Sequence, residues 1–249
     1  MKKQLTMEEI IEHKEFESSK QKVRDIESRV EGRIMSTSNK CINILYILAK
    51  TLGSKLKTYV ELGVLHGGSM ALVKMAMVRK KSGKMIGVDL FDGFDRKAHI
   101  DPVSKMEITN QVATRNLRIF GKDNLDIKFI KGDAADDATI EAVKNETGKK
   151  INLLFIDCDF KKENLVKMFT EYSKLVSSGG IILFGNYKRN GYNGVAEAID
   201  EITFKGWEEI GQYKMYYIVQ KKGSMGRPRG VKTARTLQEK LDREVNKNK

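Results

Sequence analysis

Acidic residues stand at the ends of four strand-like apolar runs in this sequence. The runs cover residues 58–62, 85–90, 127–132 and 151–157, and their acids are Glu61, Asp89, Asp133, Asp157 and Asp159. A single acid after a strand is usually a turn former or a helix cap, as we expect for Asp136 and Asp137. Because the pattern recurs in phase with the strands, it favours one carboxylate-lined site. Such a site suits a ligand with cationic groups and hydroxyl groups.

A glycine-rich loop follows the first of these acids. The segment GVLHGGS (63–69) contains Gly63, Gly67 and Gly68 and ends in Ser69. Its spacing matches neither the dinucleotide-binding fingerprint nor the P-loop, both of which bind phosphates. Glycines let a backbone approach a ligand closely, and Ser69, at the mouth of the next helix, is placed to bind a carboxylate. S-adenosylmethionine carries a sulfonium, an ammonium, a ribose diol and one carboxylate, and we therefore predict it as the cofactor.

The elements that must position these residues alternate between strand and helix. A fifth apolar run covers 180–185, and helical segments are expected near 68–81, 104–120, 136–147, 161–176 and 193–204. Apolar strands alternating with helices favour a parallel sheet that is covered on both faces. Residues 207–220 indicate two antiparallel strands joined around Gly211 at the sheet edge. We expect an α/β fold with a doubly wound, mostly parallel, seven-stranded, Rossmann-like sheet.

The ends of the chain differ from this middle part. We divide the 249 residues into an amphipathic helical extension (1–37), a cofactor-binding domain (38–220) and a basic tail (221–249). The extension is expected to hold a helix over 7–34, and a further helix is expected over 38–52, stopped by Gly53. The tail has ten Lys and Arg residues against three acidic ones, within a net charge of +13 for the chain.

Composition excludes several classes of protein. Hydrophobic residues make up 40% of the chain, enough for a sizeable core, but no apolar run approaches the roughly 20 residues that span a bilayer. The first residues lack the apolar stretch of a secretory signal, and two cysteines are too few for a disulfide framework. We expect a cytoplasmic protein without membrane segments.

Several segments, taken in order, resemble a known family. They are VELGVLHGGSMALVKMA (60–76), GVDLFDGF (87–94), LLFIDCDF (153–160), SSGGIILFGNY (177–187) and GVAEAID (194–200). Together they resemble class I S-adenosylmethionine-dependent methyltransferases, and especially the macrocin-type and catechol-type O-methyltransferases. The resemblance covers about residues 38–220. It implies a transferase that methylates a hydroxyl group of a small molecule, such as a sugar or a phenol.

The resemblance also implies roles for matching positions. It places Gly63 and Gly67, with Gly68, beneath the methionine moiety, Ser69 at its carboxylate and Glu61 at the loop or the amino group. It places Asp89 at the ribose hydroxyls, and Asp133 and Ala134 beside the adenine. Asp157 would lie near the sulfonium and, in these relatives, also ligates a divalent metal.

The metal site is one departure from the family pattern. The relatives have two adjacent acidic or amide ligands after the fifth strand, whereas this chain has Gly185 and Asn186. Asp157 and Asn186 remain as candidate ligands, with Asp159 as a substitute. Because Mg²⁺ usually needs one or two carboxylates among about six oxygens, binding of Mg²⁺ stays open at this stage.

The catalytic base is a second departure. Relatives often carry a Lys or His where this chain has Phe160. The candidates are Lys161, with Lys162 beside it, and His66, while His99 and Tyr187 are weaker ones. Asp157 is the other residue that we place in catalysis. A normal lysine is protonated near neutral pH, whereas a histidine titrates there. No base is assigned, and positioning alone can supply much of the rate of a methyl transfer.

Two other functions stay open. The basic tail, whose MGRPRGVKTAR (225–235) resembles a minor-groove-binding segment, would suit a methyltransferase that acts on nucleic acid, or binding of another polyanion. Alternatively, Gly185 and Phe160 would fit a non-catalytic binding or structural protein that keeps the fold. The N-terminal helices would cover the site or form a homo-oligomer.

Overall fold

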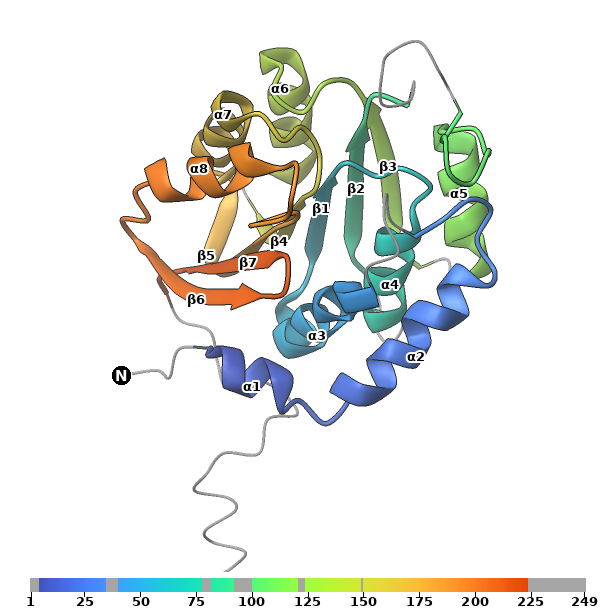
Figure 1. Ribbon diagram of the computed structural model, residues 1–249, viewed down its shortest axis with the longest axis horizontal. Helices are drawn as coiled ribbons and strands as arrows, with labels where there is room; N and C mark the ends of the chain where they lie inside the picture. The colour runs from blue at the N-terminus through green and yellow to red at the C-terminus, as the bar shows by residue number, and fades with distance from the viewer. Residues whose placement is uncertain are drawn as a thin grey trace, which may run out of the picture.

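One sheet of seven strands organises the described part of the chain (Figure 1). The computed structural model describes residues 5–34, 40–77, 82–91, 100–120, 124–148 and 150–223. In spatial order the strands are β3 (Asp126–Lys131), β2 (Lys84–Asp89), β1 (Thr58–Leu62), β4 (Ile151–Ile156), β5 (Val176–Phe184), β7 (Tyr216–Lys221) and β6 (Trp207–Tyr213). The strands from β3 to β5 pair in parallel, and β7 runs antiparallel to β5 and β6. The mostly parallel sheet with an antiparallel edge is therefore confirmed.

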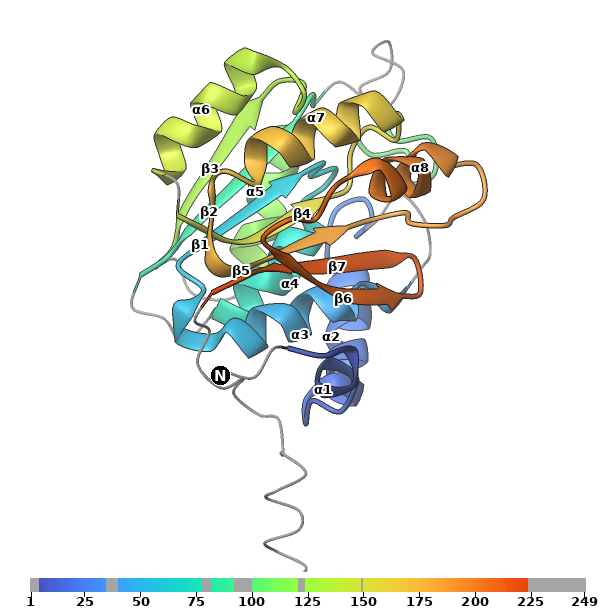
Figure 2. The same ribbon diagram turned by 90° about the vertical axis from the view of Figure 1, so that its left-hand side faces the viewer.

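Helices cover both faces of the sheet, as Figure 2 shows. One face carries α3 (Asn43–Leu52), α4 (Gly68–Met77) and α5 (Asn110–Ile119), and the other carries α6 (Asp137–Thr147), α7 (Lys162–Tyr172) and α8 (Asn193–Glu201). Side chains of β1 alternate between the two cores, with Tyr59 in the first and Val60 and Leu62 in the second. Burial on both faces explains why β1 and β4 are apolar runs without a polar face.

The N-terminal extension holds two helices, not the single helix expected over 7–34. α1 (Met7–Ile11) begins in a capping box between Thr6 and Glu9, and α2 is Phe16–Glu27. Between them the His13 side chain accepts a hydrogen bond from the Glu15 amide at 3.1 Å, and this turn breaks the helix. α1 packs on α3 and β6, and α2 packs on α3 and α4. The predicted domain boundary after residue 37 falls outside the described residues.

Two further expectations about element bounds were wrong. The edge hairpin turns at Lys214 and Met215, not at Gly211, because Tyr213 pairs with Tyr216. Gly211, with a φ of +110°, lies instead at an irregularity in β6. The helix expected over 104–120 begins only at Asn110, where the Thr109 side chain accepts a hydrogen bond from the Val112 amide at 3.2 Å.

The short 3-10 helices η1 (Lys40–Ile42) and η2 (Gly53–Lys55) flank α3. Gly53, with a φ of +52°, ends α3 as the sequence predicted. In the described ranges no helix is both long enough and apolar enough to pass through a membrane.

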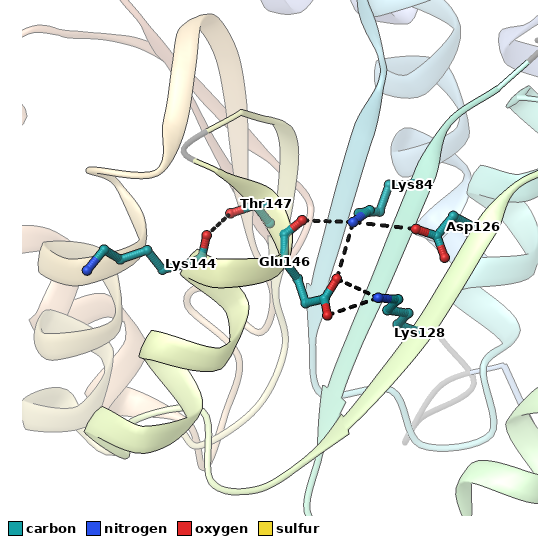
Figure 3. Close-up of polar contacts among 6 residues, drawn as sticks. All are labelled: Lys84, Asp126, Lys128, Lys144, Glu146 and Thr147. Atoms are coloured by element: carbon teal, nitrogen blue, oxygen red, sulfur yellow. Dashed lines mark hydrogen bonds and ion pairs between the residues drawn. The ribbon is translucent and has the colours of Figure 1, made fainter.

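Charged groups at the amino ends of β2 and β3 pair among themselves (Figure 3). Lys128 and Lys84 reach the Glu146 carboxylate at the end of α6, at 2.8 Å and 3.2 Å, and Lys84 also donates to the Glu146 carbonyl at 2.9 Å. Asp126 lies 3.4 Å from Lys84, and Thr147 bonds within α6 to the Lys144 carbonyl. This end of the sheet is thus a network of ion pairs that ties α6 to the strands, whereas the carboxyl ends surround a cavity.

Candidate functional site

The carboxyl edge of the parallel strands surrounds a cavity of about 570 Å³. This volume lies within the range of about 300–1,000 Å³ that is typical of cofactor and substrate pockets. The predicted site residues that line it are Gly63, Ser69, Asp89, Asp133, Ala134, Asp157, Asp159 and Lys161. Ile34 and Ile108 add apolar wall from outside the strands. Three of the lining acids follow three different strands, β2, β3 and β4, as the sequence predicted.

Glu61 lies behind the wall of this cavity and not in it. Its side chain is fully buried, and the hydroxyl groups of Tyr59 and Ser69 both donate to its carboxylate. Burial raises the pKa of Glu61 to about 8, although the two hydroxyl donors oppose this shift. Glu61 therefore supports the loop by holding Ser69, which leaves Ser69 as the polar side chain that lines the cavity from this loop.

The three glycines of the loop have different reasons to lack a side chain. Gly63 lines the cavity with a φ of +94°, and a Cβ there would lie 2.6 Å from the Asp157 carbonyl oxygen. Gly67 and Gly68 do not line the cavity. A Cβ on Gly67 would press on Ala113 of α5 at 3.3 Å, and one on Gly68 would meet the Ile34 backbone at 2.5 Å. Of the three, only Gly63 is placed to let the backbone approach a ligand.

Asp89 ties the glycine loop to the end of β2. One of its carboxylate oxygens accepts hydrogen bonds from the amides of Val64 and Leu65 at 2.7 and 2.9 Å, and the other accepts one from Phe91 at 2.9 Å. Asp133 accepts a hydrogen bond from the Ala135 amide at 2.9 Å. Both carboxylates are thus oriented by the backbone and held at the cavity wall.

Asp157, directly after β4, is held by polar contacts from the turn that follows β5. The Asn186 side-chain amide donates to Asp157 Oδ1 at 2.7 Å, and the Asn186 oxygen accepts from Arg189 Nη1 at 2.7 Å. Loss of water around the carboxylate raises the pKa of Asp157 to about 7, and the charge of Arg189 opposes this shift. Gly185 lies so close that any side chain there would collide with Asp157 Oδ1.

The three candidate metal ligands do not form a metal site. Asn186 turns its NH₂ group, which is a donor, toward Asp157. Asp159 accepts hydrogen bonds from the Asn164 side chain and from the Lys161 amide, so its carboxylate holds the start of α7. Nowhere in the described ranges do three or more His, Cys, Asp or Glu side chains gather to hold a metal ion. The residues present do not fit the divalent ion of the predicted relatives.

The other candidate bases lie in different surroundings. Lys161 lines the cavity at the entry to α7. His66 is fully buried, packs against Gly32 and accepts a hydrogen bond from the Arg33 amide at 3.3 Å, so it does not reach the cavity. Burial lowers the pKa of His66. Tyr187 is buried against Tyr217, and His99 lies outside the described residues. Asp157 and Lys161 therefore remain as cavity-lining candidates.

Residues 60–187, just over half of the chain, match the family model Methyltransf_24, described as a methyltransferase domain. The chain belongs to this methyltransferase family. It is also 30% identical over 168 residues to an uncharacterized protein of Acanthamoeba polyphaga mimivirus, a match that covers 68% of this chain and 67% of that protein.

Solved methyltransferases share the fold. The O-methyltransferase NovP superposes with a TM-score of 0.54 at 18% identity, over 73% of this chain and 79% of NovP. The calicheamicin methyltransferase CalS11 gives 0.56 at 11% identity, over 83% and 93% of the two chains. The O-methyltransferase TomG from Streptomyces achromogenes, in complex with S-adenosylmethionine, gives 0.51 at 14% identity, over 82% and 90%. The predicted class I fold is confirmed.

Sequence reasoning missed several residues around the site of this methyltransferase. Tyr59 shares the buried Glu61 carboxylate, Arg189 binds Asn186, and Ile34 reaches the cavity from the N-terminal extension. Alternation along β1 places Tyr59 on the same side as Glu61, which was a usable signal. The positions of Arg189 and Ile34 depend on turns that no periodic pattern specifies.

Proposed function

We propose that this methyltransferase binds S-adenosylmethionine in the cavity at the carboxyl edge and methylates a hydroxyl oxygen of a small molecule. The observation that carries the proposal is the set of three strand-end acids, Asp89, Asp133 and Asp157, around a cavity that Gly63 leaves open. Carboxylates suit the cationic groups and the ribose hydroxyls of this cofactor. The cavity volume of about 570 Å³ accommodates a ligand of that size.

Each residue contributes a definite contact in this proposal. Asp89 receives the ribose hydroxyls, and Asp133 and Ala134 adjoin the adenine. The first turn of α4, at Ser69, faces the carboxylate of the methionine moiety with its backbone amides. When bound, the cofactor supplies a methyl group on a positively charged sulfur. Asp157, in the wall after β4, is the group we assign to take the proton from the acceptor hydroxyl. Lys161 lies on the same wall and contributes positive charge at its rim.

Two observations support a small hydroxylated acceptor. Ile34, Ile108 and Phe160 give the cavity an apolar wall, which suits a compact organic molecule more than a polyanion. The structural neighbours include O-methyltransferases, and one of them is named as a TDP-rhamnose 3'-O-methyltransferase. A sugar or a phenol is therefore the class of acceptor to test first.

Calorimetric titration of the full-length protein with S-adenosylmethionine tests the proposal. We expect micromolar binding, weakened about tenfold or more by Asp89→Ala because the loop loses its acceptor and the ribose its partner. Asp126→Ala, an acid at the opposite end of the sheet, is the matched control and should bind normally. Absence of binding at millimolar cofactor by folded protein contradicts the proposal. Turnover on a panel of sugars and phenols separates an enzyme from a non-catalytic binding protein.

A second candidate keeps the cofactor site and changes the acceptor to nucleic acid. The observation that favours it is the charge of residues 221–249, with ten basic residues against three acidic ones. Such a segment raises affinity for any polyanion. This second candidate would be supported by salt-dependent binding of nucleic acid that is lost when the segment is deleted.

A further inference from the structure

The turn after β5 places a fixed positive charge behind Asp157. Arg189 donates to the Asn186 oxygen, and the Asn186 amide donates to Asp157, both at 2.7 Å. This orientation of the amide satisfies both neighbours, because the guanidinium has only donors and the carboxylate has only acceptors. Asn186 is buried, with 1% of its surface exposed, and Arg189 is partly buried, so the contact between Asn186 and Asp157 lies inside the protein.

The guanidinium has one further contact, with an aromatic ring. It lies over the ring of Tyr192, with its carbon 4.5 Å from the ring centroid. The Tyr192 ring meets the ring of Phe160 edge-on at 4.4 Å, and Phe160 lines the cavity. The Tyr192 amide also donates to the Arg189 carbonyl at 3.0 Å. Stacking and hydrogen bonding together fix the planar group in one orientation.

The two positions directly after β5 offer no side-chain oxygen to a metal beside Asp157. A divalent ion beside Asp157 needs further oxygen donors, yet Asn186 presents its NH₂ group there and its oxygen is bound by Arg189. Gly185 cannot be replaced by an acid without a collision with Asp157. Three residues therefore act together at this carboxylate. Arg189 supplies a positive charge, Asn186 connects it to Asp157 by hydrogen bonds, and Gly185 leaves room for the carboxylate.

We propose that Arg189, acting through Asn186, takes the place of a divalent metal at Asp157, so that this methyltransferase holds its acceptor-side carboxylate without a metal ion. The inference deepens the proposed function and rests on it. Arg189 is in this view a positioning residue, since it reaches the site through Asn186. A purely structural role, in which Arg189 only closes the turn, predicts no change in metal binding when its charge is removed.

Binding of Mn²⁺ to the full-length protein, followed by the electron paramagnetic resonance signal of the free ion, tests this proposal. With the wild type, the signal at each Mn²⁺ concentration up to millimolar should equal that of the same Mn²⁺ solution without protein. This should hold with and without saturating S-adenosylhomocysteine. The double variant Asn186→Asp/Arg189→Gln supplies a second carboxylate and removes the guanidinium. It should bind Mn²⁺ about tenfold or more tighter than the wild type, because two carboxylates then face one open position.

Matched variants separate the charge from the fold. Asn186→Asp alone should bind Mn²⁺ more weakly than the double variant, and Asn186→Asp/Arg189→Lys should return toward the wild type because the cation is restored. Lys188→Ala in the Asn186→Asp background removes a neighbouring exposed charge and should leave Mn²⁺ binding as in Asn186→Asp. Circular dichroism of each variant confirms that it is folded.

Two results would overturn the proposal. One is submillimolar Mn²⁺ binding by the wild type that Asp157→Asn abolishes. The other is a folded double variant that binds Mn²⁺ no better than the wild type, since Arg189 would then not be what excludes the ion. Titration of the same samples with S-adenosylhomocysteine reports on the proposed function separately, because cofactor binding can fail while the Mn²⁺ result still stands.

Discussion

Glu61 sits inside the fold, where its carboxylate is sealed from water beneath the glycine loop. In the folded protein its pKa is about 8, above the ordinary value of 4.5, because burial disfavours the charged form. The folded state therefore binds a proton more tightly than the unfolded state does. Its contribution to stability is fully present below about pH 4.5 and is lost as the pH rises through 8.

The variant Glu61→Gln tests whether Glu61 makes the protein less stable as the pH rises. It keeps the shape of the neutral acid but cannot ionise, so its unfolding free energy should fall less steeply between pH 6 and pH 8 than that of the wild type. The difference approaches about 1.4 kcal/mol for each pH unit. Urea denaturation at both pH values measures it, with the exposed Glu141→Gln as control. Equal slopes for wild type and Glu61→Gln would contradict the buried, proton-binding state of Glu61.

At the residue scale the sequence located the acids but not their partners. Asp89, Asp133 and Asp157 were predictable because each stands at the end of an apolar run, and parallel topology brings such ends together. The contact of Asn186 with Arg189 was not, because it depends on Asn186 adopting a φ of +60° in the turn after β5. A left-handed residue redirects the chain in a way that residue spacing alone does not reveal.

Two ion pairs of unequal burial join elements that lie outside the sheet. Arg33, in the segment after α2, makes a bidentate contact with Asp101, whose carboxylate is fully buried, and Ser104 donates to the same carboxylate. Arg115 of α5 pairs with Glu31 at 2.7 Å, but these side chains are 50% and 36% exposed. Burial by itself would raise the pKa of Asp101, but the hydrogen bonds from Arg33 and Ser104 outweigh it and lower this pKa, which keeps the acid charged.

Because a buried charge that loses its partner is costly, Arg33→Met should lower the unfolding free energy by about 3 kcal/mol at pH 7. Arg115→Met is the matched control and should have a much smaller effect, since water screens its pair. The loss in Arg33→Met should shrink below the ordinary pKa of an aspartate, where protonation relieves the unpaired carboxylate. Urea denaturation of the three proteins at pH 7 and pH 3.5 measures these differences. Similar losses in both variants would contradict a buried role for this pair.

Elements with strong periodicity or continuous apolar runs were predicted well, and the others were not. β1 to β4 lie within one residue of their expected bounds. In β1 and β4 burial on both faces requires an almost continuous apolar run, whereas the edge strand β3 is only partly buried and alternates apolar with charged residues. The turn at Lys214 and the break at His13 were missed. At His13 the side chain accepts a hydrogen bond from the Glu15 backbone amide, which competes with the hydrogen bonds of a continuous helix. The spacing of the hydrophobic residues stays helical across this break, so the spacing did not reveal it.

At the scale of the whole molecule, positive charge is concentrated in residues 221–249. The chain carries a net charge of +13. Residues 221–249 contain ten basic and three acidic residues, so they contribute about half of this charge. A concentrated positive segment attracts polyanions whatever their sequence, and the attraction weakens steeply with salt because bound counterions are released. The cavity at the carboxyl edge, by contrast, has four acids and one lysine in its lining, a charge balance that disfavours a polyanion there.

Removal of residues 224–249 should therefore weaken polyanion binding without affecting S-adenosylmethionine binding. Binding of the full-length protein to a fluorescent 20-nucleotide single-stranded DNA should weaken steeply as salt rises. The shortened protein should bind far more weakly and with a flatter dependence on salt, because fewer phosphate contacts remain. Its affinity for S-adenosylmethionine should be unchanged, since every described residue that lines the cavity is retained. If the salt dependence of DNA binding were the same in both proteins, the polyanion-binding surface would lie within residues 1–223. If the full-length protein methylated the DNA and the shortened protein did not, nucleic acid would be favoured as the acceptor over a small molecule.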